Sequence, residues 1–81
     1  MDPTPDDVRR YIAQSLDCER VEVDGDGRHF QALIVSAQFA GKNRVARHQL
    51  VYAALGDRMR EEIHALSIRA VTPEEYRELE G

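Results

Sequence analysis

The chain has 81 residues, a net charge of −4, and a composition that is 42% hydrophobic and 32% charged. These values predict one small folded domain over 1–81 and argue against a disordered chain. No apolar run approaches the roughly 20 residues that a membrane-spanning helix needs, and no secretory signal is expected. A single cysteine, Cys18, excludes an internal disulfide and favours the reducing cytoplasm.

The charges are distributed unevenly along the chain. All 15 acidic residues lie within 1–26 and 57–81. The middle segment, 27–56, has four basic residues and a net charge of +4, which leaves −8 for the remainder. The four are Arg28, Lys42, Arg44 and Arg47. This asymmetry indicates one basic face, either a solvated surface or a contact for an anionic partner.

The first half of the chain predicts a helix followed by a hairpin. Thr4 can cap a helix that begins at Pro5 and ends near Leu16, because proline suits the first helical position. Alternating side chains predict two strands, over 20–24 and 29–36, that pair as an antiparallel hairpin. The glycine-rich stretch between them predicts the turn, and residues 39–43 predict a loop after it.

The second half predicts two helices, a strand and a last helix. Residues 44–55 predict a helix whose apolar stripe contains Val45, Tyr52 and Leu55. Gly56 ends it, and Asp57 can cap a short third helix. Residues 64–71 then predict a strand. Thr72 and Glu75 form a capping box that begins a last helix of about two turns.

The resulting order, αββααβα, predicts an α+β fold. The connection between the second and third strands is long and helical, as parallel crossovers require. We therefore expect a three-stranded mixed sheet with the helices packed on one face. The second and third strands would begin at the same edge of that sheet, which brings His29 and His64 to one end.

Two imidazoles at one sheet edge form a candidate site for a metal ion or a cluster, since histidine is a common metal ligand. The ordinary alternative for each is a surface or hydrogen-bonded histidine without a ligand. No nucleophile and base are arranged for catalysis, so we expect no enzyme. Tyr11, Tyr52 and Tyr76 have a spacing that fits core packing.

Several segments together resemble the BolA-like family, in particular its short bacterial IbaG/YrbA-type branch. They are Gly25-Asp26-Gly27-Arg28-His29-Phe30-Gln31, Phe39-Ala40-Gly41, Arg44-Val45, Arg47-His48-Gln49-Leu50-Val51-Tyr52, His64-Ala65-Leu66-Ser67-Ile68 and Thr72-Pro73-Glu74-Glu75-Tyr76. The resemblance runs from about residue 20 to residue 76. It implies a fold similar to class II KH domains, which agrees with the element order derived from the residues.

The resemblance also implies a function. BolA-like proteins pair with monothiol glutaredoxins, and the heterodimer can hold a bridging [2Fe–2S] cluster that is completed by a glutaredoxin cysteine and a glutathione thiol. The family's C-terminal ligand maps onto His64. Its second ligand lies in the loop between the first two strands, where this chain offers His29, with Asp26 close by as an additional candidate. Cys18 is a more distant candidate.

That role would serve iron–sulfur cluster trafficking or iron and redox sensing. The isolated protein is expected to carry no cofactor and to be a monomer or a weak homodimer.

The alternative function is DNA binding by a small transcriptional regulator, since some BolA proteins act in that way during stress. The basic residues Lys42, Arg44 and Arg47, with His48, lie at the start of a helix–turn–helix-like pair and could contact phosphates. They could equally contact a protein partner. A nucleic-acid-binding KH domain carries a Gly-x-x-Gly loop. Gly41-Lys42-Asn43-Arg44 has only the first glycine, which weakens this alternative.

Overall fold

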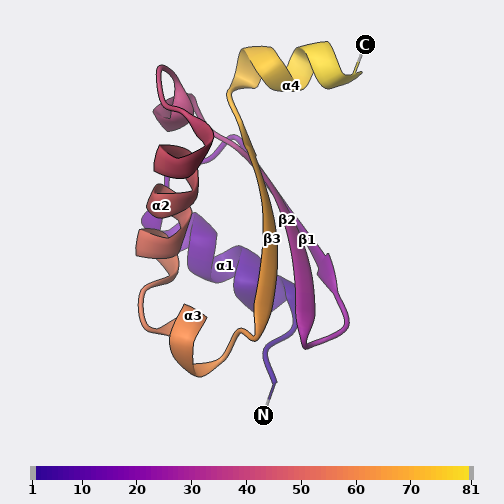
Figure 1. The fold of residues 1–81 in the computed structure, drawn as a ribbon. Helices are drawn as coiled ribbons and strands as arrows, with labels where there is room; N and C mark the ends of the chain where they lie inside the picture. The colour runs from indigo at the N-terminus through magenta and orange to yellow at the C-terminus, as the bar shows by residue number, and fades with distance from the viewer. Residues whose placement is uncertain (1, 81) are drawn as a thin grey trace.

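The structure, a computed structural model that describes residues 2–80, confirms the predicted α+β fold (Figure 1). Its elements are α1 (Pro5–Ser15), β1 (Arg20–Gly25), β2 (His29–Val35), the short 3-10 helix η1 (Ala37–Phe39), α2 (Arg44–Leu55), α3 (Arg58–Glu61), β3 (Ala65–Val71) and α4 (Pro73–Glu80). No helix among these residues is long and apolar enough to cross a membrane.

The three strands form one sheet in the order β1-β2-β3. β1 pairs with β2 in the antiparallel sense, and β2 pairs with β3 in the parallel sense, as predicted. Helices α1, α2 and α3 lie on one side of the sheet, while the opposite face is open (Figure 1). α4 continues from the end of β3 and projects past the sheet, on the side away from α2.

The predicted caps at the two terminal helices are confirmed. The Thr4 hydroxyl accepts a hydrogen bond from the Asp7 N–H at 3.1 Å, and the Thr4 N–H donates to the Asp7 carboxylate at 2.9 Å. Thr72 and Glu75 form the same reciprocal pair at the start of α4. Each capping box satisfies backbone donors that a helix start leaves without a partner.

The core lies between the sheet and the helices. β2 contributes Phe30, Ala32 and Ile34 to it, as the alternation predicted, and the half-buried Leu66, Ile68 and Ala70 of β3 pack against it. The other buried core residues are Val8, Ile12, Leu16, Phe39, Val51, Ala54, Leu55 and Ile63. Side chains of the opposite parity on the strands therefore face the open side, except at the end of β2, where Val35 is buried.

The predicted apolar stripe of α2 is wrong at two positions. Val45 is 64% exposed and Tyr52 is 41% exposed, whereas Val51, Ala54 and Leu55 are buried. Positions 51, 54 and 55 share one helical face, and the small Ala54 lets α2 approach the core there. Tyr52 thus does not fit the expected core packing, while the half-buried Tyr11 does pack against the core.

Three local expectations are also corrected. Phe39, predicted in a loop, is fully buried at the end of η1, whose start is capped by the Ser36 hydroxyl. Asp57 makes no side-chain cap at α3, because its backbone is already helical, and a cap needs an extended residue. β3 begins at Ala65, so His64 lies one residue before the strand.

Candidate functional site

The two histidine-bearing segments lie side by side at one end of the sheet. His29, the first residue of β2, is in register with Ala65, the first residue of β3. The Ala65 N–H donates a hydrogen bond to the Arg28 carbonyl at 3.1 Å, so His64 directly precedes this paired position. Both histidines are exposed to solvent. The parallel pairing of β2 and β3 is thus what brings the two residues to the same edge.

The turn before His29 is organised by Asp26. Its Oδ1 accepts hydrogen bonds from the N–H groups of Arg28 and His29, both at 2.9 Å. The Asp26 N–H donates to the His29 carbonyl at 3.2 Å. These donors, together with the nearby His29 ring, hold the pKa of the Asp26 carboxyl below its usual value. The carboxylate is therefore ionised and already engaged at neutral pH.

His29 faces the open side of the sheet at the edge of a hollow of about 560 Å³. Its side chain is 79% exposed, and its Nδ1 lies 4.0 Å from the Asp26 Oδ2. The hollow is lined by Asp24, Gly25, Asp26, His29, Phe30, Gln31, Ala65 and Ser67. His64 is not part of this lining, so the two imidazoles share an edge rather than one cavity.

The donors at this edge fit part of a cluster's ligand set. Imidazole nitrogens can replace two cysteines on one iron of a [2Fe–2S] centre. Within residues 2–80, no group of three or more histidine, cysteine or acidic side chains is placed to hold a metal ion. A cluster at His29 and His64 would therefore need its other ligands from a second molecule.

Cys18 lies away from this edge. The neighbouring Glu19 N–H donates to the Val35 carbonyl, which places this segment beside the C-terminal end of β2, opposite to His29. The Cys18 Sγ donates to the Leu16 carbonyl at 3.3 Å, and burial raises the pKa of the thiol. A protonated thiol at the far end of the strand cannot complete a site at the histidine edge.

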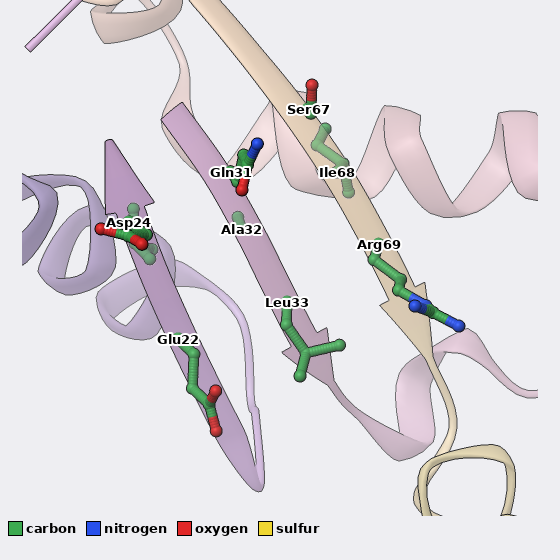
Figure 2. A pocket seen from close by; sticks show the side chains of 9 residues that line it. Glu22, Asp24, Gln31, Ala32, Leu33, Ser67, Ile68 and Arg69 are labelled. Atoms are coloured by element: carbon green, nitrogen blue, oxygen red, sulfur yellow. The ribbon is translucent and has the colours of Figure 1, made fainter. Parts of the chain in front are cut away.

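The open face of the sheet continues the hollow beside His29. Figure 2 shows the side chains that project from it: Glu22 and Asp24 from β1, Gln31 and Leu33 from β2, and Ser67 and Arg69 from β3. Together they border a shallow trough of about 590 Å³. The alternation of side chains along the strands could have predicted this polar face, which was not proposed as a site.

The basic residues of α2 line a groove against β3. This groove, of about 390 Å³, is lined by Lys42, Arg44, Arg47, His48, Ile68, Arg69, Ala70, Val71 and Glu75. Arg69 was missed because it lies outside the acid-free segment of the sequence. Among the described residues, Arg47 forms an ion pair, whereas none is found for Lys42, Arg44 or Arg69. These three are the cations available to an anionic partner.

Arg47 is a structural residue in this arrangement. Its guanidinium donates to the Ala70 carbonyl at 3.0 Å and to the Glu75 Oε1 at 2.6 Å, and its side chain is only 15% exposed. Its Nε also donates to the Lys42 carbonyl at 2.8 Å. The Arg47 guanidinium and the Thr72 backbone N–H lower the pKa of Glu75 to about 2. The predicted phosphate contact by Arg47 therefore competes with contacts that join α2, β3 and α4.

Comparison with known proteins gives consistent matches. The family model described as BolA-like protein matches residues 12–75. The acid stress protein IbaG of Escherichia coli is 38% identical over 71 residues, which cover 86% of this chain and 84% of that protein. The DNA-binding transcriptional regulator BolA of Haemophilus influenzae is 42% identical over 53 residues, 65% of this chain and 52% of that protein.

Solved structures agree with the sequence matches. A BolA protein homologue from Coxiella burnetii has a TM-score of 0.87 and 42% identity, covering 93% of this chain and 97% of its own. The solution structure of mouse BolA1 has a TM-score of 0.81 and 31% identity, covering 100% of this chain and 74% of its own.

Proposed function

Because this chain belongs to the BolA-like family, we propose that it is a cytoplasmic partner of a monothiol glutaredoxin that co-ligates a bridging [2Fe–2S] cluster. The observation that supports this role is the pair of exposed histidines at one sheet edge, with a donor set that one chain leaves incomplete. The role is binding rather than catalysis. It would serve cluster trafficking or iron and redox sensing, and the acid stress protein among the relatives fits a stress function.

The chemistry assigns a different task to each side of the complex. His64 and His29 would each offer a neutral imidazole nitrogen, while the glutaredoxin cysteine and a glutathione thiol would supply sulfur. The cluster, when bound, supplies a one-electron redox centre whose potential rises when histidine replaces cysteine. Because the histidine side is exposed, the cargo could leave when the partner dissociates.

The decisive experiment is an anaerobic titration of this protein into a cluster-loaded monothiol glutaredoxin, followed by visible circular dichroism and a sizing column. We expect the spectrum to change on mixing and the change to be lost in His64→Ala. The matched control is His48→Ala, which removes an imidazole from α2 and should leave the spectrum of the saturated complex intact. An unchanged wild-type spectrum without co-elution would contradict the proposal.

A second candidate function, DNA binding, is favoured by the basic groove and by the name of the Haemophilus relative. Lys42, Arg44 and Arg69 would contact phosphates, with His48 beside them. Each phosphate contact contributes about one unit to the slope of log affinity against log salt. Fluorescence anisotropy with a DNA duplex over a salt series would test it, and His64→Ala should leave that binding unchanged. Equal loss of DNA binding in His64→Ala and Arg44→Ala would contradict the groove as the contact.

A further inference from the structure

We propose that Asp26 is a positioning residue for His29 and is not itself a cluster ligand. The effect on cluster binding rests on the proposed function, whereas the hydrogen bonds between Asp26 and His29 do not. The geometry that carries it is the turn at Gly25–His29. Both backbone polar groups of His29 are bound by the same residue: its N–H donates to the Asp26 carboxylate, and its carbonyl accepts from the Asp26 N–H.

This double attachment fixes the backbone on either side of the His29 Cα atom. The Arg28 N–H donates to the same Asp26 Oδ1, so one carboxylate oxygen accepts from both residues that lead into β2. Hydrogen bonds to a charged acceptor are stronger than neutral ones. The direction of the His29 Cα–Cβ bond at the sheet edge is therefore set by Asp26.

The same contacts argue against Asp26 as a metal ligand. Oδ1 already accepts two backbone N–H groups, and a ligand role would require giving up these bonds or using Oδ2 alone. Oδ2 lies 4.0 Å from the His29 Nδ1, beyond hydrogen-bond distance but on that side of the ring. Asp26 therefore holds His29 through its backbone and not through a hydrogen bond to its ring.

Two substitutions separate positioning from ligation. Asp26→Asn keeps an oxygen that can accept both backbone N–H groups, although it removes the charge. Asp26→Ala removes the acceptor altogether. If Asp26 positions His29, Asn should rescue what Ala loses, whereas a carboxylate ligand would be lost in both variants. The matched control is Asp24→Ala, which deletes an acid from the same hollow. Within residues 2–80, the Asp24 side chain accepts only from the Gly25 N–H.

The first readout needs no cluster. Amide hydrogen exchange of the isolated protein should accelerate about tenfold or more at Arg28 and His29 in Asp26→Ala, the fold-change expected for losing about 1.4 kcal/mol of local stability. Asp26→Asn and Asp24→Ala should stay within about threefold of wild type.

The second readout is the dichroism titration with the cluster-loaded glutaredoxin. We expect Asp26→Asn to keep the spectral change and Asp26→Ala to lose or weaken it. Loss in both variants, with the amide exchange of Asp26→Asn unchanged, would make Asp26 a ligand and overturn the proposal. Unchanged exchange in Asp26→Ala would overturn it as well. If the wild type forms no complex, the proposed function fails, whereas the amide-exchange measurement still decides whether Asp26 holds the His29 backbone.

Discussion

The two ends of the sheet use their charged and polar residues in opposite ways. At the end where β2 and β3 begin, His29 and His64 are exposed, and the carboxylates of Asp24 and Asp26 accept hydrogen bonds from backbone N–H groups of the turn. At the opposite end, where β2 and β3 end, Arg47 and Glu75 bind each other and the backbone that joins α2, β3 and α4. One end is therefore stabilised by its ionisable groups, and the other leaves two imidazoles available to a partner.

Gly25→Ala should produce the largest effect, and it acts at the histidine end. A Cβ atom at Gly25 would lie 2.4 Å from the His29 carbonyl oxygen and 2.8 Å from the Phe30 ring, at a φ of +157°. Relieving this contact must move β2 at its first residues. We expect a loss of about 2–3 kcal/mol in the free energy of unfolding, measured by urea denaturation.

The matched control for that variant is Gly41→Ala. Gly41 also has a positive φ, of +76°, but nothing lies within 4 Å of the added methyl group. It should cost about 1 kcal/mol, the usual price of a left-handed alanine. Equal destabilisation by the two variants would show that the positive φ, and not the contact with His29, causes the loss of stability in Gly25→Ala.

Arg47→Ala removes side-chain contacts at the opposite end of the sheet. It leaves the Ala70 carbonyl and the Glu75 carboxylate without their donor, and we expect unfolding to become easier by about 2 kcal/mol. The cluster-dependent dichroism should remain in the folded variant, because the histidine edge is at the other end of β3. Loss of the dichroism at unchanged stability would contradict this separation of the two ends.

The pH dependence of the free energy of unfolding should depend on Glu75, at the same end of the sheet as Arg47. The folded pKa of Glu75 is lowered from 4.5 to about 2, so the ionised carboxylate is the form that the fold binds. Its contribution is complete above about pH 4.5 and is lost as the pH falls toward 2. Denaturation at a series of pH values should show Glu75→Gln with a shallower loss over this window than wild type. A wild-type profile that is unchanged by the substitution would refute the assignment.

The sequence predicted the topology better than it predicted the use of individual charges. Local signals such as the glycine turn and the helix caps predicted the order of the elements, because each depends on near neighbours in the chain. The long helical connection then predicted the parallel pairing of β2 and β3. The Arg47–Glu75 pair joins residues that are 28 positions apart, so no local sequence pattern predicts it. The buried face of α2 was misjudged at Val45 and Tyr52, since the buried Ala54 carries little hydrophobic signal.

The histidine edge was predicted from strand direction alone, and the structure places both residues there. Asp26 was a ligand candidate because it lies in the loop where the resemblance to the BolA-like family places the second ligand. Its hydrogen bonds to the Arg28 and His29 N–H groups depend on the geometry of the turn, which composition does not reveal.

Arg44→Ala should have the smallest effect on stability and sharpens the distinction between the two arginines of α2. Arg44 is exposed and forms no ion pair within the described residues, so its removal should change the free energy of unfolding by less than about 0.5 kcal/mol. If the groove binds DNA, the same variant should reduce the salt slope of binding by about one unit. A strongly destabilised Arg44→Ala beside a stable Arg47→Ala would reverse the roles, and would mean that the contacts of Arg47 with Ala70 and Glu75 do not stabilise the fold.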